Sequence, residues 1–378
     1  MDWQVIGLLT AGFITLLVGG ELLVRHSARF AALVGLSPLV IGLTVVAFGT
    51  SAPELAVSVI AGIDGRGDVT VGNVVGSNIF NVLFILGACA AISPLFVGRT
   101  LAWIDIPLMI GSALLAALLG RDGSVQWFEG ALLIGGLAAY TWYAVRRERR
   151  AAATSGAETG AANPAATVAA AGANPARARN ASLAWIVAGL GLLVLGSHWF
   201  VQGAVSAAQA MGVSELVIGL TIVAAGTSLP EVMTSILATI RGHREIAVGN
   251  VVGSNVFNVL GVLGISSVGA GSVAISPQVR TVDAPVMIAT SLLLLGAVAR
   301  GLRIGRAHGI VFLAGYAAYS AWLVLDAQQS TALPRFLQLL WWIGIPLVGL
   351  VLLRTLLSRR AGRPDEPAVG GAARTPTA

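Results

Sequence analysis

The chain has 378 residues, of which 56% are hydrophobic and only 11% are charged, and its formal net charge at pH 7 is +6. This composition excludes an ordinary soluble domain and is typical of a protein that crosses a membrane several times, with the lipid bilayer as its partner. The basic residues are all arginines of membrane-flanking loops, so they indicate no nucleic-acid partner. The single cysteine, Cys89, excludes a disulfide framework and a cysteine-based metal site.

A bilayer span takes about 20 apolar residues, and the chain offers two groups of five such segments. The first group, in a unit predicted over residues 1–145, lies near 4–24, 34–62, 69–92, 101–119 and 126–145. The second group, in a unit predicted over 182–326, lies near 183–209, 213–240, 246–275, 282–299 and 308–326. We expect the first span to be retained rather than cleaved, since no basic residue precedes it and it aligns with the sixth span.

The two units are joined and followed by segments of different composition. Residues 146–181 begin with RRERR and continue with a run rich in Ala, Gly, Asn and Pro, which predicts a flexible cytoplasmic loop. An extra apolar segment at 333–358 predicts an eleventh span, and residues 359–378 predict a disordered tail. The predicted fold class is therefore an all-α polytopic membrane protein of ten spans plus a C-terminal eleventh.

Two blocks of sequence occur twice in the chain, at an offset of 177 residues. GLTVVAFGTSAPE starts at Gly42 and GLTIVAAGTSLPE at Gly219, and each is followed by VGNVVGSN(I/V)FNVL. Because five spans separate the copies, the two repeats enter the membrane in opposite orientations, so their polar residues can face each other at the midplane.

The distribution of arginine predicts how the chain is oriented. If the N-terminus lies outside, only four of the 23 arginines fall in outer loops, and these are Arg66, Arg121, Arg280 and Arg335. Positively charged loops stay in the cytoplasm, so we expect a multi-pass protein of the inner (plasma) membrane with its N-terminus outside.

The polar residues of the duplicated blocks are candidates for cation binding. Glu54 and Glu231 lie in apolar segments, where ionisable groups are costly and mark ion or substrate pathways. On a helix, Thr50 falls on the same face as Glu54, and Ser77 on the same face as Asn81. Pro53 and Pro230 leave the carbonyls four residues earlier without a backbone donor, so these carbonyls can also act as ligands. Such oxygens suit a hard ion such as Ca2+ or Na+.

The blocks GTSAPE and GTSLPE, each followed by GNVVGSN(I/V)FN, resemble the two alpha repeats of the sodium/calcium exchanger family, within the cation/Ca2+ antiporter superfamily. The resemblance implies an antiporter with no cofactor, in which Glu54 and Glu231 are the central ligands of the transported ions. It also implies further ligands in both repeats: the side chains of Thr50, Ser51, Ser77, Asn81, Thr227, Ser228, Ser254 and Asn258 and the backbones of Ala47 and Ala224.

One position departs from that family and leaves the coupling ion open. Members often carry Asp where this chain has Asn258, and here both repeats carry Asn. The function expected from the sequence is exchange of Ca2+ for Na+ by alternating access, with H+/Ca2+ exchange as the alternative. A cation channel and a non-transporting scaffold are weaker alternatives. The sequence contains no nucleotide-binding loop and no paired nucleophile and base, so we expect a transporter driven by an ion gradient and not an enzyme.

Two further pairs of polar residues have structural explanations in the sequence. Asp105 and Asp283 each precede a proline by two residues, which predicts that they cap helix N-termini. For Asn73 and Asn250, helix packing or end-capping is at least as good an explanation as ion contact.

Overall fold

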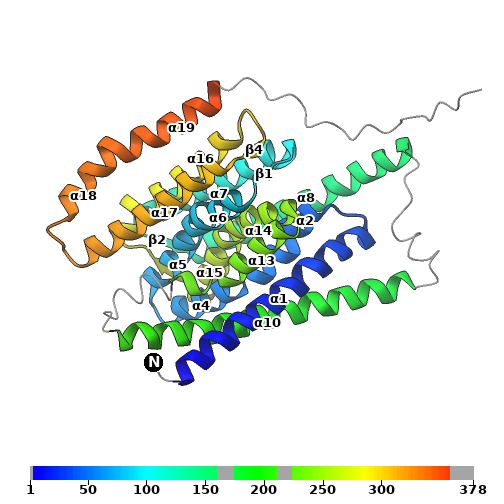
Figure 1. Cartoon of the computed structure of the whole chain (residues 1–378), viewed down its shortest axis with the longest axis horizontal. Helices are drawn as coiled ribbons and strands as arrows, with labels where there is room; N and C mark the ends of the chain where they lie inside the picture. Colours follow the sequence, from blue (N-terminus) through cyan, green and yellow to red (C-terminus); the bar gives the residue numbers. More distant parts are fainter. Residues whose placement is uncertain (1–2, 160–173, 212–223, 358–378) are drawn as a thin grey trace, which may run out of the picture.

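The computed structural model describes residues 3–159, 174–211 and 224–357 (Figure 1). The predicted seventh span at 213–240 therefore falls partly outside the described residues, and the predicted tail at 359–378 falls wholly outside them.

The first half consists of helices, several of which contain a π-helical turn. Its elements are α1 (Trp3–Val34), α2 (Pro38–Ile41), η1 (Gly42–Val46), α3 (Ala47–Thr50), α4 (Ala52–Ile63), α5 (Gly67–Phe80), η2 (Asn81–Leu86), α6 (Gly87–Ile92), β1 (Leu95–Phe96), η3 (Leu101–Asp105), α7 (Ile106–Leu119), η4 (Gly120–Asp122), β2 (Ser124–Gln126) and α8 (Trp127–Thr159).

The second half repeats this order where it is described. Its elements are α10 (Pro175–Ala210), α12 (Ala224–Gly226), α13 (Leu229–Ile240), α14 (Arg244–Phe257), η6 (Asn258–Leu263), α15 (Gly264–Ala270), β3 (Ser272–Ala274), η7 (Val279–Asp283), α16 (Ala284–Val298), β4 (Arg303–Ile304) and α17 (Arg306–Ala327). After it come α18 (Leu333–Leu339), η8 (Leu340–Gly344) and α19 (Ile345–Leu357).

Eight helical segments of the described chain are long and apolar enough to cross a bilayer. A ninth is obtained if Pro38–Thr50 and Ala52–Ile63, which meet at an angle of 46°, are counted as one broken span. The predicted fifth span is helical as part of α8, although α8 is not among these apolar segments. The described residues thus show a helical membrane protein with eight or nine candidate spans, against eleven predicted.

The helices on either side of the predicted central loop run further into it than the sequence indicated. Residues 146–159 continue α8, because Arg, Glu and Ala are strong helix formers and extend a helix already begun in the preceding span. On the other side, α10 begins at Pro175, and the Oδ1 atom of Asn174 accepts hydrogen bonds from the backbone N–H groups of Ala176 and Arg177. The predicted boundaries at 146 and 181 therefore do not coincide with helix ends.

Two short antiparallel strand pairs, which the sequence did not predict, lie among the helices. β1 pairs with β4, and β2 pairs with β3, so each pair joins one half of the chain to the other. In the second pair Val125 lies opposite Val273, and both side chains are buried. The sequence pattern missed these strands because two or three residues are too few to show an alternation of apolar and polar positions.

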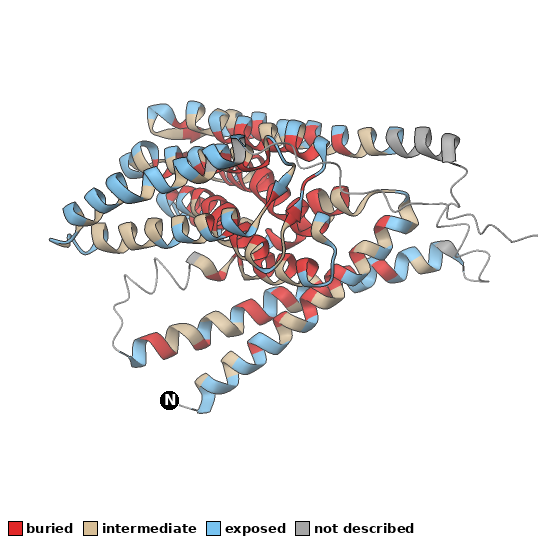
Figure 2. Ribbon diagram, turned by 45° about the horizontal axis from the view of Figure 1, so that its top comes forward, coloured by how far each residue is buried: buried red, intermediate tan, exposed pale blue. Residues whose placement is uncertain are grey.

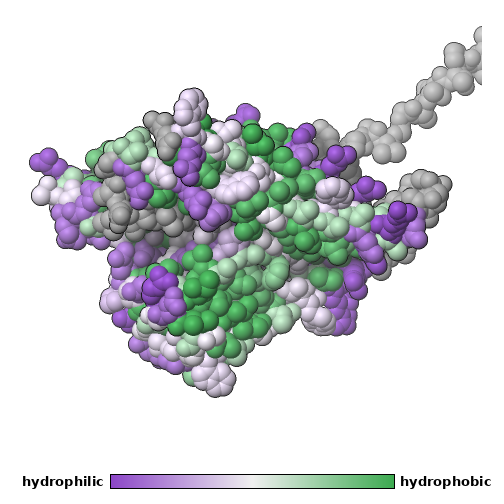
Figure 3. Space-filling view, turned by 90° about the horizontal axis from the view of Figure 1, so that it is seen from below, coloured by the Kyte–Doolittle hydropathy of each residue, from purple (hydrophilic) through white to green (hydrophobic). Residues whose placement is uncertain are grey.

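The core is formed by the two segments that carry the second duplicated block. The helix Arg244–Ala270 is the most buried of the candidate spans, and Gly67–Ile92 is next (Figure 2). The last candidate span is peripheral: no described side chain of α18 or α19 is buried, and both helices lie along one edge of the molecule (Figure 1). Broad apolar areas are exposed on the face that Figure 3 shows, as expected where helices contact lipid.

Helices α1 and α10 lie side by side at the opposite edge of the molecule and contact each other through glycines (Figure 1). A Cβ atom added at Gly196 would lie 2.8 Å from the Leu16 backbone nitrogen and 2.9 Å from the Gly12 carbonyl oxygen. A Cβ atom at Gly189 would lie 2.9 Å from the Gly19 carbonyl oxygen. Small residues of this kind let two membrane helices approach until their backbones touch.

We expect Gly196→Val to separate α1 from α10 and to lower the free energy of unfolding by about 1–3 kcal/mol, because backbone atoms cannot move aside for the new side chain. Gly191→Val, on the same helix, is the matched control, since a Cβ atom there meets nothing within 4 Å. Thermal unfolding of the purified variants in detergent measures the difference. Equal melting temperatures for the two variants would contradict the close glycine contact.

Candidate functional site

The two duplicated glutamates lie where the broken helices restart. Glu54 is the third residue of α4 and Glu231 the third residue of α13, and both side chains are buried, at 1% and 0% exposure. Each helix has a proline in its first turn. A backbone N–H at this position has no acceptor within the helix, so the N–H that proline lacks is not missed. The free N–H groups and the positive end of a helix dipole favour a carboxylate at this position.

Each glutamate is held by a serine from the other half of the chain. Ser51 Oγ donates to Glu231 Oε1 at 3.0 Å, and Ser228 Oγ donates to Glu54 Oε1 at 2.8 Å. Ser228 Oγ also lies 3.3 Å from Ser77 Oγ. The two GTS segments are therefore interleaved, and the two carboxylates belong to one site.

The two duplicated asparagines lie at the start of π-helical turns. η2 begins at Asn81 and η6 at Asn258, and both side chains are buried. Asn81 Nδ2 donates to Asn255 Oδ1 at 3.0 Å, and Asn258 Nδ2 donates to Asn78 Oδ1 at 3.3 Å. A π turn widens the helix locally and is often found at functional sites.

The two threonines are tied to a second layer of amides. Thr50 Oγ1 donates to Asn250 Oδ1 at 3.1 Å, and Thr227 Oγ1 donates to Asn73 Oδ1 at 3.4 Å. The amide nitrogens of this layer donate in turn to serines, from Asn73 to Ser58 and from Asn250 to Ser235. Asn73 and Asn250 thus do more than cap or pack helices, since each lies within hydrogen-bond distance of a threonine hydroxyl from the other half.

The two threonine contacts differ in burial. Thr50 and Asn250 are fully buried, whereas Thr227 and Asn73 are partly exposed.

The backbone carbonyls expected to act as ligands, from the proline pattern or from the family resemblance, are partly occupied. Gly226 O accepts a hydrogen bond from Ser197 Oγ at 2.6 Å, and Ala47 O accepts one from Ser51 N at 3.0 Å. Ala224 is the first described residue after the gap at 212–223 and begins α12. Thr50 Oγ1 also lies 3.4 Å from Ala47 O, so this carbonyl has two donors within hydrogen-bond distance.

The site contains several buried oxygen atoms without a hydrogen-bond partner. These atoms are Glu54 Oε2, Asn81 Oδ1, Glu231 Oε2, Ser254 Oγ and Asn258 Oδ1. Buried polar atoms are almost always paired, because each unpaired one costs about 1–3 kcal/mol. Four of these five can only accept, so each can take a partner that is either a hydrogen-bond donor or a positive ion.

No arginine supplies that positive partner within the described residues. The ion pairs found there are Arg66–Asp64, Arg147–Asp105 and Arg241–Glu21, and none involves Glu54 or Glu231. Across the same parts of the chain, no three or more His, Cys, Asp or Glu side chains are grouped so that they could hold a metal ion. Two carboxylates with amide and hydroxyl oxygens form a donor set that suits a hard cation as cargo.

Asp105 and Asp283 do not cap helices, so that prediction is wrong. Each is the last residue of a π-helical turn and makes no side-chain capping bond. Asp105 instead accepts from Tyr140 Oη at 3.3 Å and pairs with Arg147 at 3.3 Å, while Asp283 accepts from Tyr319 Oη at 2.9 Å. Both aspartates therefore tie their helix to another helix of the same half.

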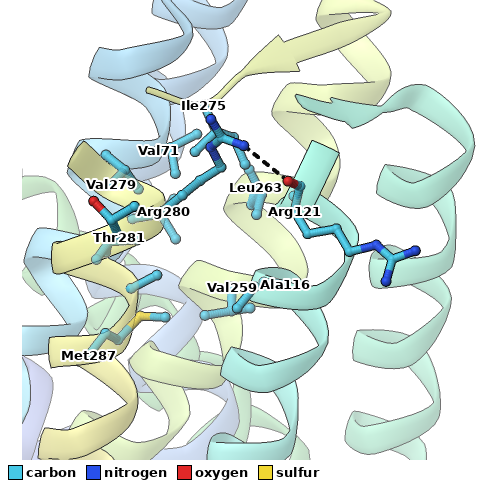
Figure 4. A pocket seen from close by; sticks show the side chains of 15 residues that line it. Val71, Ala116, Arg121, Val259, Leu263, Ile275, Val279, Arg280, Thr281 and Met287 are labelled. Atoms are coloured by element: carbon cyan, nitrogen blue, oxygen red, sulfur yellow. Dashed lines mark hydrogen bonds between the residues drawn. The ribbon is translucent and has the colours of Figure 1, made fainter. Parts of the chain in front are cut away.

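A separate apolar cavity of about 350 Å³ lies between α5, α7, η6 and α16 (Figure 4). Its lining contains no carboxylate, and Arg280 Nη1 at its rim donates to Arg121 O at 3.0 Å. Val259 and Met287 line its inner part. This chemistry does not suit a cation, so the cavity is not part of the candidate ion site.

Fold and site together define a multi-pass helical membrane protein with a buried, oxygen-lined centre, and comparison with known proteins agrees. The model of the sodium/calcium exchanger protein family matches residues 4–146 and 181–325. Sodium/calcium exchanger MaX1 of Methanosarcina acetivorans is 30% identical over 337 residues, which cover 82% of this chain and 96% of MaX1. Inner membrane protein YrbG of Escherichia coli (strain K12) is 33% identical over 317 residues, with 82% and 95% covered.

A solved structure of the sodium-calcium exchanger NCX_Mj, soaked with 10 mM Na+ and zero Ca2+, superposes with a TM-score of 0.71 at 32% identity. The match covers 85% of this chain and 99% of that one. The chain belongs to the sodium/calcium exchanger family of membrane antiporters.

Proposed function

We propose that this protein exchanges Ca2+ for Na+ across the inner membrane by alternating access to the site between Glu54 and Glu231. The observation that carries the proposal is the set of unpaired buried oxygens around two carboxylates that have no arginine partner. The names of MaX1 and NCX_Mj support sodium and calcium as the ions, and the name of YrbG supports the inner membrane.

The charge of the site provides a physical basis for exchange. Two carboxylates are neutralised by one Ca2+, by two Na+ or by two protons. Each of these three loads leaves no net charge in a medium of low dielectric constant. An empty site keeps two buried charges unbalanced, which is costly. Movement of the helices is therefore favoured when the site is loaded, and that condition couples one ion to the other.

The proposed architecture is two inverted five-helix repeats, over 1–145 and 182–326, with the N-terminus outside and an eleventh helix at 333–358. Reciprocal hydrogen bonds support the inversion, since Ser51–Glu231 and Ser228–Glu54 exchange their roles between halves. Full burial of both glutamates favours an exchanger over an open channel.

H+/Ca2+ exchange is the second candidate, and it is favoured by the asparagines at 81 and 258. With only two fixed negative charges, three bound sodium ions would leave a positive centre in a poorly solvated cavity, which is costly. Sodium exchange with at most two sodium ions bound at once, or proton exchange, avoids this cost.

We expect Glu54→Gln and Glu231→Gln each to reduce Ca2+ exchange by about 100-fold or more, because a neutral amide replaces half of the charge that balances a divalent ion. Uptake of Ca2+ into vesicles with an imposed sodium gradient measures the loss. Glu245→Gln, an exposed glutamate at the start of α14, is the matched control. Substantial exchange by a well-inserted Gln variant at either buried site would rule out the two-glutamate centre.

Asn258→Asp adds a third carboxylate, and we expect it to make Ca2+ efflux from loaded vesicles depend more strongly on external sodium at fixed pH. Asn258→Ala, which removes the amide oxygen without adding charge, should weaken the response instead. If neither wild type nor Asn258→Asp responds to sodium while both respond to a proton gradient, the coupling ion is the proton.

A further inference from the structure

Asn78 and Asn255 were not among the predicted ligands, yet each contacts a predicted ligand across the two halves. Both are fully duplicated, at the same offset of 177 as the ligands, which is the signal in the sequence that could have identified them. Asn255 Oδ1 accepts from Asn81 Nδ2, and Asn78 Oδ1 accepts from Asn258 Nδ2. All four side chains are buried, with 3% exposure or less. We call these four residues the amide clasp.

The direction of each amide in the clasp is fixed from its outer end. Asn78 Nδ2 donates to the Asn255 backbone carbonyl at 3.3 Å and lies 3.4 Å from Met287 Sδ. Asn255 Nδ2 donates to the Asn78 backbone carbonyl at 3.5 Å and lies 3.4 Å from Met109 Sδ. A backbone carbonyl and a thioether can only accept, so the group that faces them must be the NH2 of the amide.

This constraint passes along the clasp to the ion site. Since the NH2 group of Asn255 faces the Asn78 carbonyl, its Oδ1 atom faces Asn81, and Asn81 must present its own NH2 group in return. The Oδ1 atom of Asn81 is then directed away from the clasp and has no partner. The other half follows the same logic. Asn78 directs its NH2 group to the Asn255 carbonyl and its Oδ1 atom to Asn258 Nδ2, and Asn258 Oδ1 is left without a partner.

We propose that Asn78 and Asn255 are positioning residues that turn the oxygen atoms of Asn258 and Asn81 toward the transported cation. The inference rests on the proposed exchange function and concerns the same site. A side-chain amide is a cation ligand in only one of its two orientations, because the other presents an NH2 group with partial positive charge. A carboxylate has two equivalent oxygens and needs no such control, so the clasp matters because this chain has Asn, not Asp, at both positions.

The test is a double-mutant cycle on Ca2+ exchange in vesicles under an imposed sodium or proton gradient, whichever drives the wild type. Asn255→Leu removes the acceptor of Asn81 Nδ2. It should raise the half-saturating Ca2+ concentration by about tenfold, which corresponds to the loss of one net hydrogen bond. In the Asn81→Asp background no amide needs orienting, and the carboxylate faces the acceptor Oδ1 of Asn255. The same Asn255→Leu change should therefore leave that concentration unchanged or lower it. Asn78→Leu with Asn258→Asp repeats the cycle in the other half.

Comparing the two backgrounds separates a positioning role from a folding defect. A general loss of packing caused by Asn255→Leu would raise the half-saturating Ca2+ concentration whether residue 81 is Asn or Asp. Thermal unfolding of all four proteins gives an independent measure of that loss. Equal shifts of half-saturation in both backgrounds, in a wild type that exchanges Ca2+, would overturn the positioning role and leave the proposed function standing. Absence of Ca2+ exchange in the wild type under either gradient would overturn both.

Discussion

The structure depends on two carboxylates buried without a basic partner. The effective cost of burying an ionised group is several kcal/mol per ion, and a hydrogen bond to a charged group contributes only about 1.5–3 kcal/mol in return. The single serine bonds to Glu54 and Glu231 therefore cannot offset the burial of both charges. The remaining stabilisation has to come from a cation or from protons, and this requirement is the physical basis of the site.

The backbone of the core is shaped to place oxygen atoms around that charge. The break after Thr50 places Glu54 in the first turn of α4, and the π-helical turns at Asn81 and Asn258 shift those side chains relative to a regular helix. Breaks and π turns weaken a helix, and a bilayer cannot supply replacement hydrogen bonds. The cost is tolerated here because these segments lie in the buried centre, where Ser197 Oγ donates to one of the freed carbonyls, that of Gly226.

The hydroxyl and amide groups around the carboxylates share one pattern. Ser51, Ser228, Thr50 and Thr227 each donate to a protein acceptor, as do the NH2 groups of Asn81 and Asn258. The Oδ1 atoms of Asn81 and Asn258 are left without a partner. In the proposed function these oxygens bind the cation, and the neighbouring amides orient them for that role.

The sequence by itself determined the class of protein, the duplication and most of the polar residues of the site. Composition and periodicity are local properties, and the offset of 177 paired Glu54 with Glu231 and Asn81 with Asn258 without any knowledge of the fold. Local pattern could not show which partner each of these residues has. Only the tertiary structure decided that Ser51 donates to Glu231 and that Asn255 accepts from Asn81, because these contacts join residues more than 170 positions apart. The same reason explains the wrong assignment of Asp105, whose tyrosine and arginine partners lie on a helix that the sequence could not place beside it.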